Sequence, residues 1–389
     1  MTNIRKNSIV YLDNKELDIE TVTSLFKNLN VNSIASQLSI RELRLMVKSY
    51  YIAQDHRIRL DNQISQIEKH NQENPENPQP YLGLKDTANF FRGIEERNKN
   101  IMDIYTSIPT NVGAVWAKSI CGIGPVLSAG FVVNIDIRKA PTCSPILSYF
   151  GQNPNLKWVT NETKIEALIK STLEEHNQTK INEFIVEMVC AKLNRKSNQS
   201  KNFLLRLTAE KGEKFKYESL ERISMDDLVK AIKLPPFNLD MKTLCWKLGE
   251  SFVKVSGNKN DFYGQIYKQR REYENIKNEA GEYAPIAEEK LRNFDIGKNT
   301  DAYKAYSKGK LPAQHLFSRS KRYAVKIFIS HLHAVMYWHH YKMLPPAPYA
   351  MGILGHSDLI GIPNAEVVGF PNDDYMLLGR QRKGYGMEE

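Results

Sequence analysis

The stretch Ile120-Cys121-Gly122-Ile123-Gly124-Pro125-Val126-Leu127-Ser128-Ala129 has the pattern of two helices joined by a tight glycine turn. Gly122 and Gly124 allow a sharp turn and a close approach of the backbone to a ligand. Pro125 suits the first position of a second helix, where a backbone N–H would have no helical partner. The N–H groups that begin that helix form an anion site suited to a phosphate. The pattern predicts a helix-hairpin-helix that binds the nucleic-acid backbone, with a plain turn between packed helices as the alternative.

The composition indicates a folded protein with a polyanionic partner. Apolar residues make up 41% of the 389 positions, and 54 Lys and Arg against 44 Asp and Glu leave a net charge of +10. The four cysteines are scattered without a C-x-x-C pair, so neither a zinc ribbon nor a disulfide framework is expected. The chain shows no signal-like start and no apolar run near the roughly 18 residues of a membrane helix. We therefore expect a cytoplasmic protein that contacts no membrane.

Residues 1–104 are expected to form a helical arm after a short strand-like start at 9–12. From Ile40 onward a stripe of spacing three and four predicts a long helix. The proline-rich segment 74–80 breaks that helix, and a second helical pattern runs over 87–105. The result is a coiled-coil-like helical hairpin. Such an arm either joins subunits into a homo-oligomer or packs within a bundle, and its half-polar seam leaves both open.

The fold class that follows is mainly α. A long helical hairpin is followed by a helix-hairpin-helix domain with a basic insertion and a C-terminal helical region. The expected boundaries are 1–104 for the arm, 105–158 for the helix-hairpin-helix, 159–236 for the insertion, 237–344 for the C-terminal helical region and 345–389 for a Gly/Pro-rich tail with little regular structure. The insertion also has a pattern compatible with a helix-turn-helix around 194–205, or with an ordinary solvated helix surface.

Two blocks of the chain resemble the C-terminal helix-hairpin-helix domain of the bridge-RNA-type insertion-sequence transposases, which carry an N-terminal RuvC-like domain. The first block, 105–158, contains the hairpin and Tyr149-Phe150-Gly151. The second block, 238–275, contains the run 241–252 and Asp261-Phe262-Tyr263. Together they cover under a third of the chain. The resemblance implies a scaffold that binds DNA for transposition.

The sequence departs from that family where the family's chemistry is located. Its RuvC-like domain supplies four acidic residues for metal-dependent catalysis, whereas in 1–104 only Asp13 follows a strand-like segment, and one acid cannot hold the metals. Its catalytic serine would fall in 152–158, which contains no serine. We therefore expect no catalytic residue and no cofactor in this chain, and a separate nuclease is a possible partner.

The residues expected to bind nucleic acid fall into two groups. The backbone phosphate site comprises Gly122, Ile123, Gly124 and Val126, and its electrostatic surround comprises Lys118, Arg138, Lys139, Arg319, Lys321 and Arg322. The last three lie in 318–323, which opens the strongest predicted helix of the chain, where basic side chains oppose the helix dipole and an anion would relieve them. A locally solvated basic cluster is the alternative interpretation.

The run His331-Leu332-His333 matches the His-hydrophobic-His signature of single-strand nicking enzymes, which present both histidines from a strand. Here the apolar residues around it recur at three and four, which predicts a helix. Side chains two positions apart on a helix point about 200° from each other, so these two cannot chelate one ion. We therefore expect no metal site.

Three classes of function follow from these patterns. The favoured class is a transposase-like protein of a mobile element or phage that binds DNA, or structured RNA, without nuclease activity of its own. The second is a transposase or recombinase, a DNA strand transferase whose active site is unrecognised or is completed by a partner chain. The third is a helical assembly protein in which the hairpin is only a turn.

Overall fold

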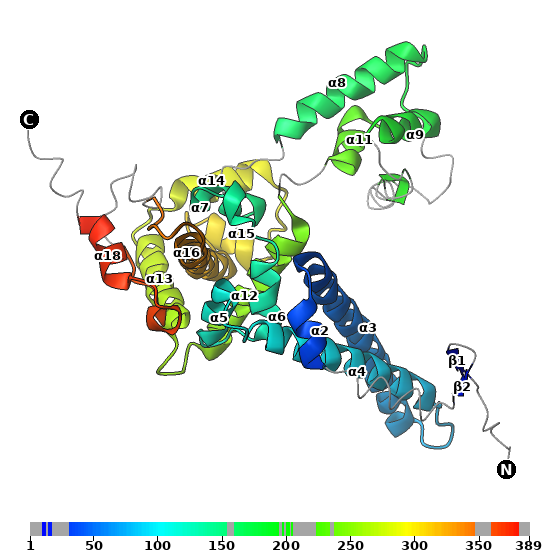
Figure 1. Cartoon of the computed structure of the whole chain (residues 1–389). Helices are drawn as coiled ribbons and strands as arrows, with labels where there is room; N and C mark the ends of the chain where they lie inside the picture. The colour runs from blue at the N-terminus through cyan, green and yellow to red at the C-terminus, as the bar shows by residue number, and fades with distance from the viewer. Residues whose placement is uncertain are drawn as a thin grey trace, which may run out of the picture. The chain divides into compact units, whose positions relative to one another are not determined.

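The computed structural model describes residues 10–12, 15–17, 31–153, 159–193, 197, 200–202, 204, 223–233, 237–346 and 359–380. Across these residues the chain is mainly helical, which confirms the predicted fold class (Figure 1). The strand-like start forms β1 (Val10–Leu12), which pairs antiparallel with β2 (Lys15–Leu17). The chain divides into two compact units, residues 1–143 with 247–389, and residues 144–246. No helix in the described part combines the length and apolar character needed to cross a bilayer.

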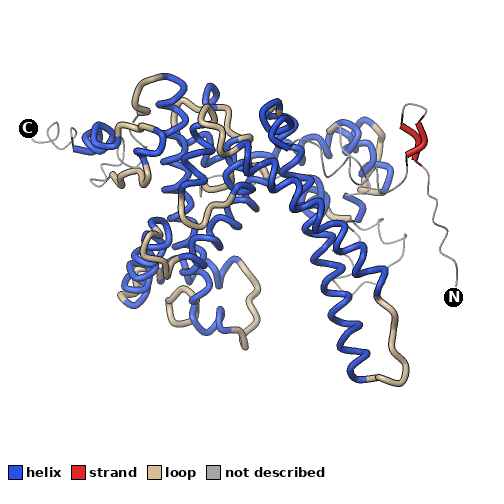
Figure 2. The backbone as a smooth tube through the Cα atoms, turned by 60° about the horizontal axis from the view of Figure 1, so that its bottom comes forward, coloured by secondary structure: helices blue, strands red, loops and turns tan. Residues whose placement is uncertain are grey.

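The helical arm of the first unit consists of α3 (Ile40–Glu73) and α4 (Leu82–Tyr105), with α2 (Val31–Gln37) packed on α4. A capping box begins α3, because the Ser39 hydroxyl accepts the Glu42 N–H and the Glu42 carboxylate accepts the Ser39 N–H. The two long helices run side by side and antiparallel, as Figure 2 shows. The helical hairpin predicted for this region is therefore present.

The seam of the arm changes character along its length. At its base Leu43 and Val47 are buried against Met102 and α6 residues. Farther along α3, Arg57 pairs with Glu95 of α4 at 2.5 Å and with its own helix at Asp61. The apolar half thus attaches the arm to the rest of the unit, while ion pairs hold the polar half together.

The body of the first unit is built around α16. The Phe328 ring lies 5.5 Å from the Trp116 ring centroid, 5.4 Å from Phe131 and 5.6 Å from Tyr263. Its burial draws α5, α6 and α13 onto one helix. The helices of this body are α5 (Val112–Ser119), α6 (Pro125–Val132), η1 (Ile137–Lys139), α12 (Leu239–Val255, whose first half belongs to the second unit), α13 (Phe262–Glu279), α14 (Ala284–Asn293), α15 (Asp301–Tyr306) and α16 (Ala313–Tyr341).

The expectation of little regular structure after residue 345 is wrong for 359–380. This segment forms η3 (Ala365–Val368) and α18 (Asn372–Arg380). The Trp116 indole N–H donates to the Pro363 carbonyl at 2.8 Å, and Tyr375 is 1% exposed. Contacts with residues more than two hundred positions away stabilise the segment, and local Gly and Pro content does not reveal them. Residues 347–358 and 381–389 of the predicted tail lie outside the described residues.

The second unit contains α7 (Cys143–Tyr149, whose first residue belongs to the other unit), α8 (Val159–Glu175), α9 (Glu183–Lys192) and α11 (Met225–Ile232). Its core is aliphatic, formed by side chains of α8, α9 and α11. Lys201 pairs with Glu183 and Glu187, each at 2.6 Å, so this lysine is engaged within the unit. Most of the predicted helix-turn-helix lies outside the described residues.

Candidate nucleic-acid interface

The hairpin turn, residues 120–124, has the geometry that the glycine pattern predicts. Gly122 adopts φ +85°, a left-handed conformation that glycine accepts without strain. Gly124 is the N-cap of α6, with φ −85° and ψ 177°, and Pro125 takes the first helical position. The first helical hydrogen bond runs from the Ser128 N–H to the Gly124 carbonyl at 3.0 Å. The N–H groups of Val126 and Leu127 therefore precede the helical ladder.

The approach to these N–H groups is open. Gly124 is exposed, and a Cβ built on it would meet no atom within 4 Å. Gly124 has no side chain, and its cap position carries no side-chain hydrogen bond to the first turn of α6. An anion placed at Gly124 would face unpaired donors and the positive end of the helix dipole.

The opposite side of the turn is closed by α12. The Ser251 hydroxyl donates to the Gly122 carbonyl, and a Cβ on Gly122 would lie 3.0 Å from a methyl group of Val255. On the same side, the Asn258 amide lies 3.6 Å from the Cys121 sulfur. A segment well over one hundred positions away thus fixes the turn, which gives the open side a preset shape.

Two of the predicted site residues contribute only backbone. Ile123 is 5% exposed, and Val126 packs its side chain against the cluster that joins the arm to α6. Their burial fixes the start of α6 against the core. The groups of these two residues that remain for a ligand are main-chain atoms.

Two predicted cations are neutralised by nearby carboxylates. The Lys118 ammonium lies 2.7 Å from an Asp103 carboxylate oxygen and donates to the Ser107 hydroxyl at 2.6 Å. Arg138 makes a two-pronged contact with Asp136, at 2.9 and 3.0 Å, and lowers the pKa of that carboxyl chiefly through these hydrogen bonds. Neither residue offers an uncompensated charge to the hairpin turn.

Lys139 of η1 is exposed next to Arg138. It lies far from the predicted basic residues of α16. The adjacent Ala140 carbonyl is bonded to His333, near the C-terminal half of α16. Tyr341 lies close enough to Arg138 to influence its pKa. From Arg322 to Tyr341 α16 rises about 30 Å. The predicted surround is therefore divided between two ends of one helix.

The three basic residues near the start of α16 also have different neighbours. Lys321 is 7% exposed and pairs with Glu250 of α12, so its charge is used inside the fold. Arg319 lies 2.8 Å from the Glu274 carboxylate of α13. Arg322 is exposed. Lys321 is therefore removed from the expected phosphate surface, and the other two face α13.

Sequence reasoning missed two lysines of α12, the helix that closes one side of the turn. Lys247 precedes Ser251 by one helical turn, and its ammonium lies 3.7 Å from the Tyr51 ring centroid. Burial lowers the pKa of Lys247. Lys254 is exposed and directly precedes Val255, which touches Gly122. The signal for both was their helical spacing with Ser251, but the contact of α12 with the turn was not visible in the sequence.

The two histidines of α16 have separate partners. His331 bonds the Tyr263 hydroxyl at 2.8 Å and the Ile360 carbonyl at 3.0 Å, whereas His333 bonds the Ala140 carbonyl at 2.9 Å. Burial lowers the pKa of His331 to about 4. Both side chains lie on the predicted helix and tie other segments to it. In the described part of the chain, no group of three or more His, Cys, Asp or Glu side chains is arranged to hold a metal ion.

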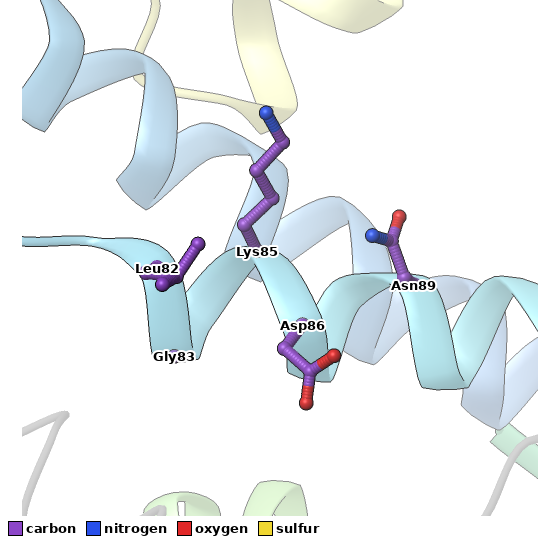
Figure 3. A pocket seen from close by; sticks show the side chains of 5 residues that line it. All are labelled: Leu82, Gly83, Lys85, Asp86 and Asn89. Atoms are coloured by element: carbon purple, nitrogen blue, oxygen red, sulfur yellow. The ribbon is translucent and has the colours of Figure 1, made fainter.

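The first turns of α4 carry a hollow of about 580 Å³. Figure 3 shows that its lining side chains diverge, with Lys85 and Asp86 on opposite sides of the helix. Groups that point apart cannot converge on one ligand, so this hollow is not a candidate binding site.

Comparisons with models of known protein families, with curated proteins and with solved structures find no match. The open end of α6 is therefore the candidate site on the strength of its geometry. It presents main-chain donors, a helix N-terminus and a rigid turn, which together suit a phosphate oxygen.

Proposed function

We propose that this protein is a transposase-like protein of a mobile element or phage that binds the sugar-phosphate backbone of DNA, or of structured RNA, at the hairpin turn. The observation that carries the proposal is the exposed, uncapped Gly124 in front of the N–H groups of Val126 and Leu127. Main-chain donors contact phosphates and not base edges, so binding would be independent of sequence.

The surroundings of the turn support this proposal. The Ser251 hydrogen bond and the left-handed Gly122 hold the turn in one shape, which reduces the ordering cost of binding. Lys254 adds an exposed positive charge on α12, next to Val255, which touches Gly122, and the chain carries a net charge of +10. Positive charge of this kind attracts nucleic acid and makes the affinity fall with salt.

The proposal assigns no nuclease activity to this chain. Its sequence lacks the serine of the family that it resembles, and a partner with a RuvC-like domain would supply cleavage. The enzyme alternative, a strand transferase with a partner-completed active site, predicts divalent-dependent DNA cleavage by the purified chain. Such cleavage would contradict the proposed function.

Assembly through the helical arm is the second candidate function, and exposed apolar side chains favour it. Ile52 and Phe90 are 59% and 66% exposed on α3 and α4. Apolar surface of this kind marks interaction sites when it is contiguous. Light scattering tests the idea, because a monomer at micromolar concentration would remove the expected homo-oligomer.

The hairpin is tested by replacing Gly124 with Asp. The backbone at this position already has N-cap geometry, so the new carboxylate accepts the N–H groups of the first turn and repels phosphate. We expect duplex DNA affinity to fall about tenfold, a change of ~1.4 kcal/mol. Thermal stability should stay equal or rise, since Asp caps better than Gly by a few tenths of a kcal/mol.

Two control variants accompany this measurement. Gly124→Ala leaves the N–H groups accessible and should bind as the parent does, because its Cβ meets open space. Gly93→Asp adds the same charge on the exposed surface of α4, where a Cβ also meets nothing within 4 Å. If Gly124→Asp binds duplex as tightly as Gly93→Asp does, the hairpin is not the contact.

A further inference from the structure

A second concentration of positive charge lies where α13 packs along α16 (Figure 1). On α16, Arg319, Arg322 and Lys326 are spaced by three and four residues, so they share one face. Arg270 of α13 reaches the same region, because its guanidinium lies 4.6 Å from the Tyr323 ring centroid. These four basic residues are called the α13–α16 basic cluster below.

Glu274 is the buried carboxylate of this cluster. Its side chain is 1% exposed and accepts hydrogen bonds from Arg270 at 2.9 Å, Arg319 at 2.8 Å and the Tyr283 hydroxyl at 2.6 Å. Burial acts to raise the pKa of Glu274, but these hydrogen bonds outweigh it and the pKa is lowered. The carboxylate is thus ionised and fully used by two of the four cations.

The remaining two cations of the cluster are Arg322 and Lys326. Among the residues that the structure describes, no ion pair joins Arg322 or Lys326 to a carboxylate, and the Arg322 Nε donates to the Ser318 carbonyl at 3.2 Å. Burial, together with repulsion from Arg322, Arg270 and Arg319, lowers the pKa of Lys326. Like charges held together away from full solvation repel each other, and an anion between them removes that repulsion.

We propose that the α13–α16 basic cluster binds a phosphoryl group of the nucleic-acid strand, with Arg322 and Lys326 as the direct contacts. This rests on the proposed function for the identity of the ligand. A guanidinium offers paired N–H donors that match two phosphate oxygens, and an ammonium adds a point charge. Arg270 and Arg319 are both bound to Glu274, and they are positioning residues and not direct contacts.

Arg270, a supporting residue of the site, is held between two aromatic rings. The Arg270 guanidinium lies 4.6 Å from the ring centroids of both Tyr273 and Tyr323, so rings from two helices restrict it. Stacked guanidinium groups keep their orientation with little loss of side-chain entropy on binding. Arg270 therefore supports the cluster with a fixed position as well as with charge.

The cluster and the hairpin turn belong to the same packed unit. Phe328 follows Arg322 by about 9 Å along α16 and packs against Trp116 of α5, the helix that leads into the turn. Both contacts are thus parts of one packed unit. The cluster would add charge-based affinity to a turn that itself offers neutral donors.

The test is the salt dependence of duplex DNA binding by the full chain carrying Arg322→Gln and Lys326→Gln. Loss of the one phosphate contact that these two side chains share should reduce the slope of log K against log salt by about 0.9. The control carries Lys268→Gln and Lys308→Gln, which remove the same charge from exposed positions outside the cluster. Equal slopes in the two double variants would overturn the proposal.

A measurement of stability separates binding from a structural role. Because the two side chains repel their neighbours, the cluster variant should unfold at the same temperature as the parent or higher in the absence of ligand. A drop of several degrees that accompanies the loss of slope would assign a packing role instead and count against the site. Lys326→Arg keeps the charge and should restore the slope.

Inorganic pyrophosphate distinguishes a strand contact from a site for a free phosphoryl compound. Cluster-dependent thermal stabilisation by millimolar pyrophosphate, with an unchanged duplex slope, would assign a free ligand and overturn the strand contact. Failure of the hairpin is recognised separately, since Gly124→Asp would then bind like its control while the cluster variant still loses slope. Failure of the cluster leaves the Gly124 result unaffected.

Discussion

The hairpin turn and the α13–α16 basic cluster suit the same chemical group by opposite means. The turn presents uncharged main-chain N–H groups at Gly124, and the cations nearest to it in sequence, such as Lys118, are already paired. The cluster presents side-chain charge in excess of its one buried carboxylate, Glu274. A phosphate can therefore be bound either by main-chain donors, with little charge, or by charged side chains, with few main-chain contacts.

This difference decides how each site would respond to perturbation. Neutral donors release few counterions, so the turn should contribute affinity that varies little with salt, whereas the cluster should dominate the salt slope. The turn depends on a contact with α12 at Ser251, and the cluster on an internal ion network. Measurements of stability on variants of Ser251 and of the ion network around Glu274 should therefore separate the two sites.

The largest effect is expected at the centre of the cluster. Glu274→Gln removes the partner of two partly buried guanidinium groups, Arg270 and Arg319, and should lower the free energy of unfolding by about 3 kcal/mol. Urea unfolding measures this loss in the free energy of unfolding. The control Glu279→Gln breaks an exposed pair with Lys310 and should cost under ~1 kcal/mol. Similar losses in both variants would show that Glu274 does not organise the cluster.

A smaller effect is expected at the turn. Gly122→Ala forces a side chain into φ +85° and places its Cβ 3.0 Å from Val255, so about 2 kcal/mol of stability should be lost. Gly124→Ala, two residues away in open space, should lose none. The same substitution is thus destabilising at one glycine of the turn and neutral at the other. Equal unfolding midpoints for the two variants would contradict the left-handed role of Gly122.

The support from α12 should be weaker again. Ser251→Ala leaves the Gly122 carbonyl without its hydroxyl donor and should lower the free energy of unfolding by about 1 kcal/mol. Ser256→Ala is the control, because that hydroxyl donates to the Val253 carbonyl at the end of its own helix. Duplex affinity should also fall in Ser251→Ala, since a looser turn presents its N–H groups less rigidly. Unchanged stability and affinity would mean that α12 does not fix the turn.

Local patterns predicted what local interactions determine. The spacing of apolar residues predicted the arm and α16, and the Gly-Ile-Gly-Pro run predicted the turn and the start of α6. The pairing of Arg138 with Asp136, two residues away, was also within reach of the sequence. Helix periods and turn chemistry are short-range properties, so these features needed no knowledge of packing.

The sequence did not reveal which residues far apart in the chain contact each other. Lys321 was expected on the phosphate surface, but Glu250, seventy-one positions earlier, takes its charge. Ser251 closes the turn from 129 positions away. The spacing of Arg319, Arg322 and Lys326 was visible, yet the basic cluster exists only because α13 brings Arg270 against α16. Which charges stay uncompensated depends on which helices pack together, and helical periodicity does not specify that.

The smallest expected effect is a difference between the two sites with pH. The lowered pKa of Lys326 means that this side chain loses its charge at a lower pH than an ordinary lysine does. Folding stability should rise with pH across that window, because the unfolded chain then binds the extra proton. Duplex binding should instead weaken, as the cluster loses a cation while the N–H groups at Gly124 do not titrate. The salt slope of the parent should therefore fall by up to about one between neutral and alkaline pH, and that of Lys326→Gln should stay constant. A parent slope that is insensitive to pH would show that Lys326 makes no phosphate contact, and the hairpin turn would remain the main candidate contact.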